Sequence, residues 1–314
     1  MSSDGVTLLF GLALLGVGLV LNRYRIGRRF AARRARRVDL RLTRLLDRAQ
    51  VAEAVTVMLH EINRLRRVAA TDEDRVRLAS MLRRCANEYH HDGRLDEARP
   101  LAEEAVAVAR VVAVSHPGHV AGPLVTLAQV LADQRDDDSA LRWLREAYDD
   151  VRADTAGNPE SDAQRVLVAA NYSMVLRRVG AAEEAVAVAR WGIGIDQGIA
   201  PGVLPPFTRA SAGWLHSALA IAGTDAGQDG RAAAREAVEI WRGLLANGVF
   251  AEHESEGAGY ADFALAYALR PFDPAAAEES ARRASARFES LAVQAPVRLA
   301  RRRAEVDALL AAMA

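Results

Sequence analysis

Two sets of neighbouring histidines are the residues whose type and spacing come nearest to a metal site. They are His90-His91 and His116-x-x-His119. Imidazole nitrogens bind zinc, usually together with cysteine or carboxylate ligands at short spacing. Neither set has the cysteine or carboxylate arrangement of a zinc site, so the sequence predicts no metal centre.

Paired glutamates are the second group of residues with chemical potential. They recur as Glu103-Glu104, Glu183-Glu184 and Glu278-Glu279. Each pair falls on a predicted helix, where a solvated outer face is expected rather than a catalytic carboxylate pair. The chain has no Gly-x-Gly-x-x-Gly, Gly-x-x-x-x-Gly-Lys or Gly-x-Ser-x-Gly motif, so neither a phosphate cradle nor a nucleophile elbow is predicted. We expect neither enzyme activity nor a cofactor.

A recurring pattern of small and large residues reveals the elements that carry these side chains. Residues 82–105 and 124–147 share the same internal offsets of 3, 1, 3, 9, 4 and 3, which places Ala98 and Ala140 42 residues apart. Weaker copies occupy 169–192, 218–241 and, more loosely, 260–284. Because one helix pair cannot bury its apolar face alone, such periodicity predicts a stacked array of helix pairs.

This spacing resembles the tetratricopeptide repeat (TPR), and the resemblance covers about residues 78–291. Residues 93–98, Gly-Arg-Leu-Asp-Glu-Ala, match that family's turn between helices. The 42-residue period, with His116-Pro117 in the connection, is similar to the kinesin-light-chain variety. The resemblance implies an all-α fold, an α-solenoid of antiparallel helix pairs. Asp225 stands where the family has an aromatic residue or leucine, so a distorted fourth repeat is expected.

The composition agrees with an all-helical chain. Aromatic residues are 5% of the sequence, and the 10 prolines fall mostly between predicted helices. All 41 basic residues are arginine, which indicates the codon bias of a high-GC bacterium rather than an anion site at each position. The single cysteine, Cys85, occupies a core position of the repeat and is predicted to be a small buried hydrophobe.

The N-terminus has the pattern of a membrane anchor. Residues 6–21 carry no charge, and an arginine cluster follows. The positive-inside rule then predicts a single-pass protein of the cell membrane, with its N-terminus outside and the array in the cytoplasm. A cleaved signal peptide and a helix buried in the protein or in an oligomer are the alternatives. The arginines predicted at the membrane surface are Arg23, Arg25, Arg28, Arg29, Arg33, Arg34, Arg36 and Arg37.

Charge is distributed unevenly although the formal net charge is zero. Residues 1–38 hold 8 of the 41 basic and 1 of the 41 acidic residues, which leaves 33 against 40, a net charge of −7, in the remainder. The arginine cluster is therefore expected to contact anionic lipid headgroups. Nucleic-acid binding is the competing interpretation, and the acidic array disfavours it.

Helix-start signals and linkers divide the chain further. Thr71, followed by three acidic residues, predicts a helix start, and Pro296 predicts another. The final helix is expected to be a solvating cap with Arg301-Arg302-Arg303 on its polar side. The apolar loop at 198–207 could pack in the groove or on the convex side. The predicted segments are an anchor at 1–22, an arginine-rich segment at 23–38, an amphipathic helical connector or leading repeat at 39–70, four to five repeats at 71–294, and the cap at 295–314.

The resemblance also predicts which side chains line the concave surface. Arg83 and Asn87 match positions where some family members hold Lys and Asn to grip a peptide's terminal carboxylate, and Asn171 matches another such position. Arginine and asparagine supply the charge-assisted donors that a carboxylate needs. The alternative is that these are only solvated polar residues of a groove. The full predicted partner-binding set is Arg83, Arg84, Asn87, Gln129, Asn171, Arg177 and Arg178.

These patterns favour a membrane-anchored adaptor that binds a protein or peptide in its concave groove on the cytoplasmic side. A second hypothesis is a self-associating structural scaffold of a membrane complex. A third is a regulatory subunit of an enzyme or transcription system that is encoded elsewhere.

Overall fold

The computed structural model describes residues 33–46, 50–113, 115, 118–153, 159–199, 206–248, 256–293 and 296–313. The predicted anchor at 1–22 lies outside these residues. Among the helices that the structure describes, none is both long and apolar enough to cross a bilayer. The chain divides into two compact units, Met1–Glu61 and Ile62–Ala314.

In the first unit, residues 33–46 and the start of α2 (Val51–Val68) are helical. Leu42, Leu45, Val55 and Met58 are buried at helical spacing, as the amphipathic pattern predicts. Glu61 is also buried, with an oxygen 3.9 Å from Nε of Arg34.

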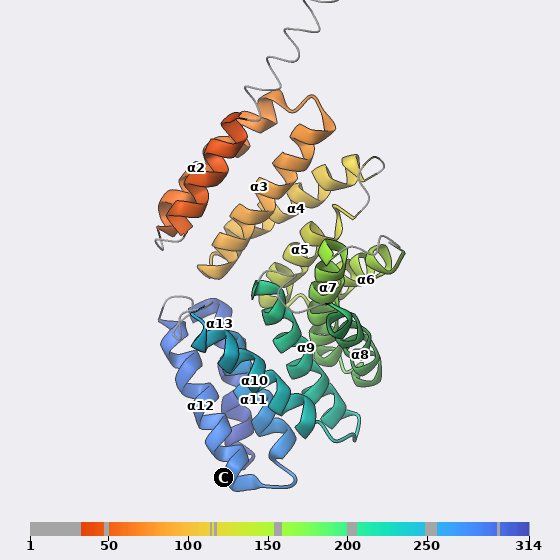
Figure 1. The fold of residues 1–314 in the computed structure, drawn as a ribbon. Helices are drawn as coiled ribbons and strands as arrows, with labels where there is room; N and C mark the ends of the chain where they lie inside the picture. Colours follow the sequence, from red (N-terminus) through yellow and green to blue (C-terminus); the bar gives the residue numbers. More distant parts are fainter. Residues whose placement is uncertain are drawn as a thin grey trace, which may run out of the picture. The chain divides into compact units, whose positions relative to one another are not determined.

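The second unit is built from antiparallel helix pairs, and its described residues contain no strand (Figure 1). Consecutive helices of a pair pack along their length, and neighbouring pairs stack. The all-α solenoid expected from the sequence is therefore confirmed. The pairs are α3 (Asp72–His91) with α4 (Leu95–Val112), α5 (Ala121–Asp133) with α6 (Asp137–Ala153), α7 (Pro159–Arg178) with α8 (Ala182–Gly198), α9 (Pro206–Asp225) with α10 (Arg231–Ala246), and α11 (Glu256–Leu269) with α12 (Pro274–Ala292), followed by α13 (Pro296–Ala311).

Small residues let the two helices of a pair approach closely. The alanines that open the second helices, Ala98, Ala140, Ala185 and Ala234, are all fully buried. Cys85 is buried as well, and burial raises the pKa of its thiol to about 11. The repeat pattern therefore marks the positions where the helices touch.

The turn within a pair has the same backbone geometry in the first three repeats. In the first, the N–H of Arg94 donates to the carbonyl of Tyr89, and the same pattern recurs after α5 and after α7. The turn needs one residue with positive φ, which is Gly93 at 74° and Gly180 at 83° in repeats one and three. The second repeat holds Arg135 there at 66°.

Trp241 of α10 packs closely against a glycine of each neighbouring helix. A Cβ at Gly257 of α11 would lie 1.8 Å from the indole, and one at Gly213 of α9 would lie 2.5 Å from it. Gly192 shows the same effect, because a Cβ there would lie 2.7 Å from Cβ of Ala169. An alanine at position 192 would therefore require α7 and α8 to move apart.

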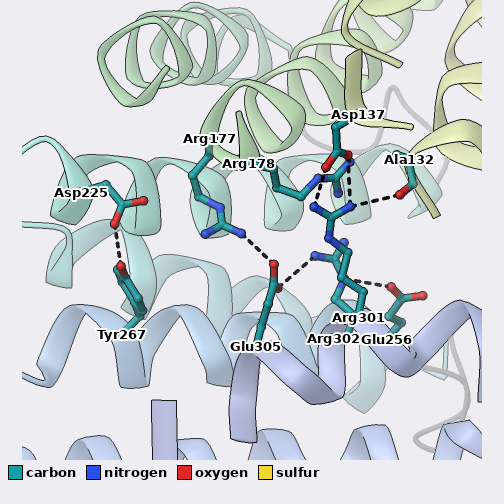
Figure 2. A network of polar contacts seen from close by, with 10 residues as sticks. All are labelled: Ala132, Asp137, Arg177, Arg178, Asp225, Glu256, Tyr267, Arg301, Arg302 and Glu305. Carbon is teal, nitrogen blue, oxygen red and sulfur yellow. Dashed lines mark hydrogen bonds and ion pairs between the residues drawn. The ribbon is translucent and has the colours of Figure 1, made fainter. Parts of the chain in front are cut away.

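The fourth repeat forms a helix pair despite its weak sequence match. Asp225 ends α9 and accepts a hydrogen bond of 2.6 Å from the hydroxyl of Tyr267 in α11 (Figure 2). A polar link to the next repeat thus takes the place of the large apolar residue expected at this position.

Candidate functional site

A cavity of about 360 Å³ opens on the inner face formed by the first helices of the pairs. Its walls come mainly from α3, α5, α7 and α9, together with Leu144 of α6, Glu256 at the start of α11 and Arg302 of α13. Of the predicted partner-binding set, five residues line it and Arg84 and Arg177 do not. The five are Arg83, Asn87, Gln129, Asn171 and Arg178.

Arg83 is the predicted residue best placed to bind a ligand. Its side chain borders this cavity and also a second, more apolar one of about 400 Å³. Neither a hydrogen bond nor an ion pair joins Arg83 to another residue of the described ranges. Burial, and then the nearby charge of Arg84, lower the pKa of its guanidinium below the usual value. An anion in the cavity would stabilise the charged guanidinium and so oppose both effects.

Two of the three amides of the predicted set, those of Gln129 and Asn171, make hydrogen bonds within the protein. Nε2 of Gln129 donates to Oδ1 of Asn171 at 2.9 Å, which links α5 to α7. Nδ2 of Asn171 donates to the carbonyl of Leu167 at 2.9 Å. Asn171 therefore lines the cavity, but its amide already has partners.

The histidine pair lies at one edge of the cavity. Nε2 of His90 is 2.7 Å from a carboxylate oxygen of Asp133, and the rings of His90 and His91 are 5.7 Å apart. This contact ties the end of α3 to the end of α5. Within the described ranges, no group of three or more histidine, cysteine or acidic side chains is arranged to hold a metal ion.

Arg177 and Arg178 are both ion-paired within the chain, and of the two only Arg178 lines the cavity. Nη2 of Arg177 is 3.0 Å from Glu305 of α13, and Nη2 of Arg178 is 3.1 Å from Asp137 of α6 (Figure 2). Burial is the largest influence on Arg178 and lowers its pKa, as does the charge of Arg302. Arg178 can therefore contact a ligand only beside the residues it already binds.

The final helix forms as predicted, but its position corrects the expectation of a solvating cap. Of Arg301, Arg302 and Arg303, only Arg303 is exposed. Arg301 donates to both oxygens of Asp137 at 3.1 and 2.5 Å, and Arg302 lies 3.4 Å from Glu256 (Figure 2). The sequence offered no sign of this, because the partners of Arg301 lie 164 and 169 residues away.

The membrane-surface set is only partly described. Arg33, Arg34, Arg36 and Arg37 lie on the helix at 33–46 and are exposed. The four arginines from Arg23 to Arg29 lie outside the described residues, as does most of the 198–207 loop.

No family model matches this sequence, and a search of curated proteins gives no match. Solved structures do match. BtubC (BKLC) from P. vanneervenii is 14% identical, covers 80% of this chain and 92% of its own, and gives a TM-score of 0.53. With the helix pairs above, this similarity shows a TPR-like repeat fold. At this identity it bears on the fold alone.

Two further structures match with TM-scores below 0.5. A putative kinesin light chain of Podospora anserina with nearly identical TPR-like repeats is 19% identical, covers 68% of this chain and 96% of its own, and has a TM-score of 0.47. A Rap protein complexed with competence and sporulation factor is 16% identical, covers 87% and 74%, and has a TM-score of 0.49.

Proposed function

We propose that this protein is a membrane-anchored adaptor that binds a protein or peptide in the cavity on the inner face of its repeats. The observation that carries the proposal is Arg83, a partly buried guanidinium with no partner among the described residues, on the wall of that cavity. Asn87, one turn further along α3, lies on the same wall. Together they offer donors to a carboxylate of the partner.

The rest of the cavity suits a peptide side chain. Val125, Ala128, Met174 and Trp214 supply apolar surface around the polar groups. Binding sites for small ligands and peptide ends commonly combine an apolar lining with a few placed donors. A carboxylate next to an apolar side chain would therefore use both parts of the wall.

The anchor is proposed from the sequence. The uncharged residues 6–21 followed by arginines support a single span, with the array on the cytoplasmic side. The exposed arginines at 33–37 are placed in sequence to contact anionic headgroups next to such a span. Tag accessibility at both termini in intact cells tests this topology, and a C-terminal tag reached from outside would overturn it.

Site-specific photo-crosslinking in cells tests the cavity. The photoreactive residue benzoylphenylalanine replaces Met174, which lines the cavity, or Arg142, which is exposed on α6 outside it. We expect a distinct adduct from position 174 that Arg83→Ala and Asn87→Ala each weaken. Arg84→Ala is the matched control, because Arg84 neighbours Arg83 in sequence but does not line the cavity.

Two outcomes would contradict the adaptor proposal. One is the same set of adducts from positions 174 and 142. The other is a position-174 adduct that Arg83→Ala and Arg84→Ala change equally. An adduct that contains only a second copy of this chain would favour the self-associating scaffold instead.

A further inference from the structure

The last helix, α13, is held by two faces of different character. On its apolar face, Leu299, Val306 and Leu309 are buried in the cluster that contains Phe288 of α12. On its polar face, charged side chains reach α5, α6 and α7, at least 128 residues earlier in the chain (Figure 2). The apolar face makes α13 part of the last repeat, and the polar face ties that repeat to the second and third.

This long-range tie is unusual for a solenoid. Repeats in such arrays contact only their neighbours, so small changes between successive pairs add up and the curvature is easily altered. A contact between distant repeats removes that freedom. The polar face of α13 is therefore placed to set how tightly the inner face curves.

Asp137, at the start of α6, is the centre of the tie. Both of its oxygens accept hydrogen bonds from Arg301, and Oδ1 is 3.1 Å from Arg178. Nη1 of Arg301 also donates to the carbonyl of Ala132 at the end of α5, at 3.1 Å. A second link joins Glu305 to Arg177 at 3.0 Å.

The two faces differ in how readily they separate. Detaching the apolar face would expose fully buried leucine and valine side chains, which is strongly unfavourable. Detaching the polar face would replace desolvated ion pairs by hydrated charges. The free-energy change is small, because the lost Coulombic attraction is largely offset by the regained hydration. On this face, Nε of Arg177 and Nε of Arg178 also lack hydrogen-bond partners among the described residues.

The same residues border the cavity. Arg178, Arg302 and Glu256 line it together with Arg83 and Asn87. Separation of the polar face would move Arg302 away from Arg178 and widen the cavity at that end. Separation would also leave the apolar face of α13 packed on α12.

We propose that the polar face of α13 is a clasp that holds the repeats closed around the cavity, and that its opening admits the partner. The clasp itself is independent of any partner, whereas the admission step rests on the proposed function. The two parts are therefore measured separately.

Distances between spin labels in the full chain test the clasp. The labels are attached at Asp149→Cys in α6 and Asp307→Cys in α13, both exposed, in a background of Cys85→Ser. We expect one narrow distance distribution at low salt. At about 1 M salt, where the screening length is about 3 Å, the distribution should broaden toward longer distances. Asp137→Asn should give the broad distribution already at low salt.

Matched controls separate the clasp from general charge effects. Asp138 is the exposed neighbour of Asp137, and Arg303 is the exposed neighbour of Arg302. Asp138→Asn and Arg303→Gln should keep the narrow distribution, and Arg301→Gln should broaden it as Asp137→Asn does. Helix content from circular dichroism should be unchanged in all four variants. The clasp is refuted if Asp137→Asn and Asp138→Asn give the same distribution as the parent at every salt concentration.

The admission step is tested by the crosslink at position 174. We expect Asp137→Asn to raise the adduct yield several-fold over Asp138→Asn in the same cells. An open clasp with an unchanged yield would overturn the admission step and leave the clasp intact. An unchanged clasp with a normal adduct would overturn this inference and leave the adaptor proposal intact.

Discussion

Replacing Gly257 by alanine is the sharpest test of how the later repeats pack. The added Cβ would lie 1.8 Å from Cζ2 of Trp241, 2.3 Å from Cη2 and 2.4 Å from Cε2. The indole has little room to move, because a Cβ at Gly213 would already lie 2.5 Å from its Nε1. Trp241 is itself 4% exposed. The substitution therefore forces α10 and α11 apart.

The magnitude follows from two opposing effects. Overpacking a close-packed contact costs about 1–3 kcal/mol, and the near overlap of three ring atoms places this case at about 3 kcal/mol. Alanine in place of glycine within a helix stabilises the folded protein by up to about 1 kcal/mol. We expect Gly257→Ala to lower the free energy of unfolding by about 2 kcal/mol.

Urea unfolding of the full chain in a mild detergent, followed by circular dichroism, measures this change. Gly243→Ala in α10 is the matched control, because it is exposed and its Cβ would meet no atom within 4 Å. It should stabilise by about 0.5–1 kcal/mol. In the Trp241→Leu background, Gly257→Ala should lose most of its penalty. A Gly257→Ala chain as stable as the parent would refute the reasoning.

Three further predictions follow from the described residues. Arg135→Gly should raise the free energy of unfolding by about 1 kcal/mol in the same urea assay, because Arg135 has φ 66°, whereas Gly180→Ala, at φ 83°, should lower it. Burial by itself raises the pKa of Asp137, but the hydrogen bond from Arg301 and the charge of Arg178 lower it overall. The stability it contributes should be present above its unfolded pKa of about 3.8 and be lost as the pH falls through the lowered folded value. Acid titration of unfolding should show this loss in the parent and not in Asp137→Asn. Cys85, with a buried thiol of pKa about 11, should react with a thiol reagent at pH 8 only after urea unfolds the chain.

Local sequence accounts for much of the inner face. The helix at Thr71 begins as predicted, since its hydroxyl accepts from the N–H of Asp74 at 3.2 Å. Arg83 and Asn87 lie one turn apart on α3 and so share a helix face, and Gln129 of α5 lines the same cavity. What the register could not reveal was which of these side chains has a partner. Asn171 has two, and Arg83 has none within the described residues.

Residue spacing alone determined that this chain is a stack of helix pairs, because each repeat is a local unit whose small and large residues lie within about forty positions of one another. Only the tertiary structure determined which residues the last helix, α13, contacts. The sequence around an arginine does not indicate which distant residue it will pair with. Arg301 contacts Asp137 only because the curvature of several repeats brings α13 back to the inner face. The need for glycine at position 257 also comes from the tertiary structure, since the indole that a Cβ there would overlap belongs to the preceding helix pair.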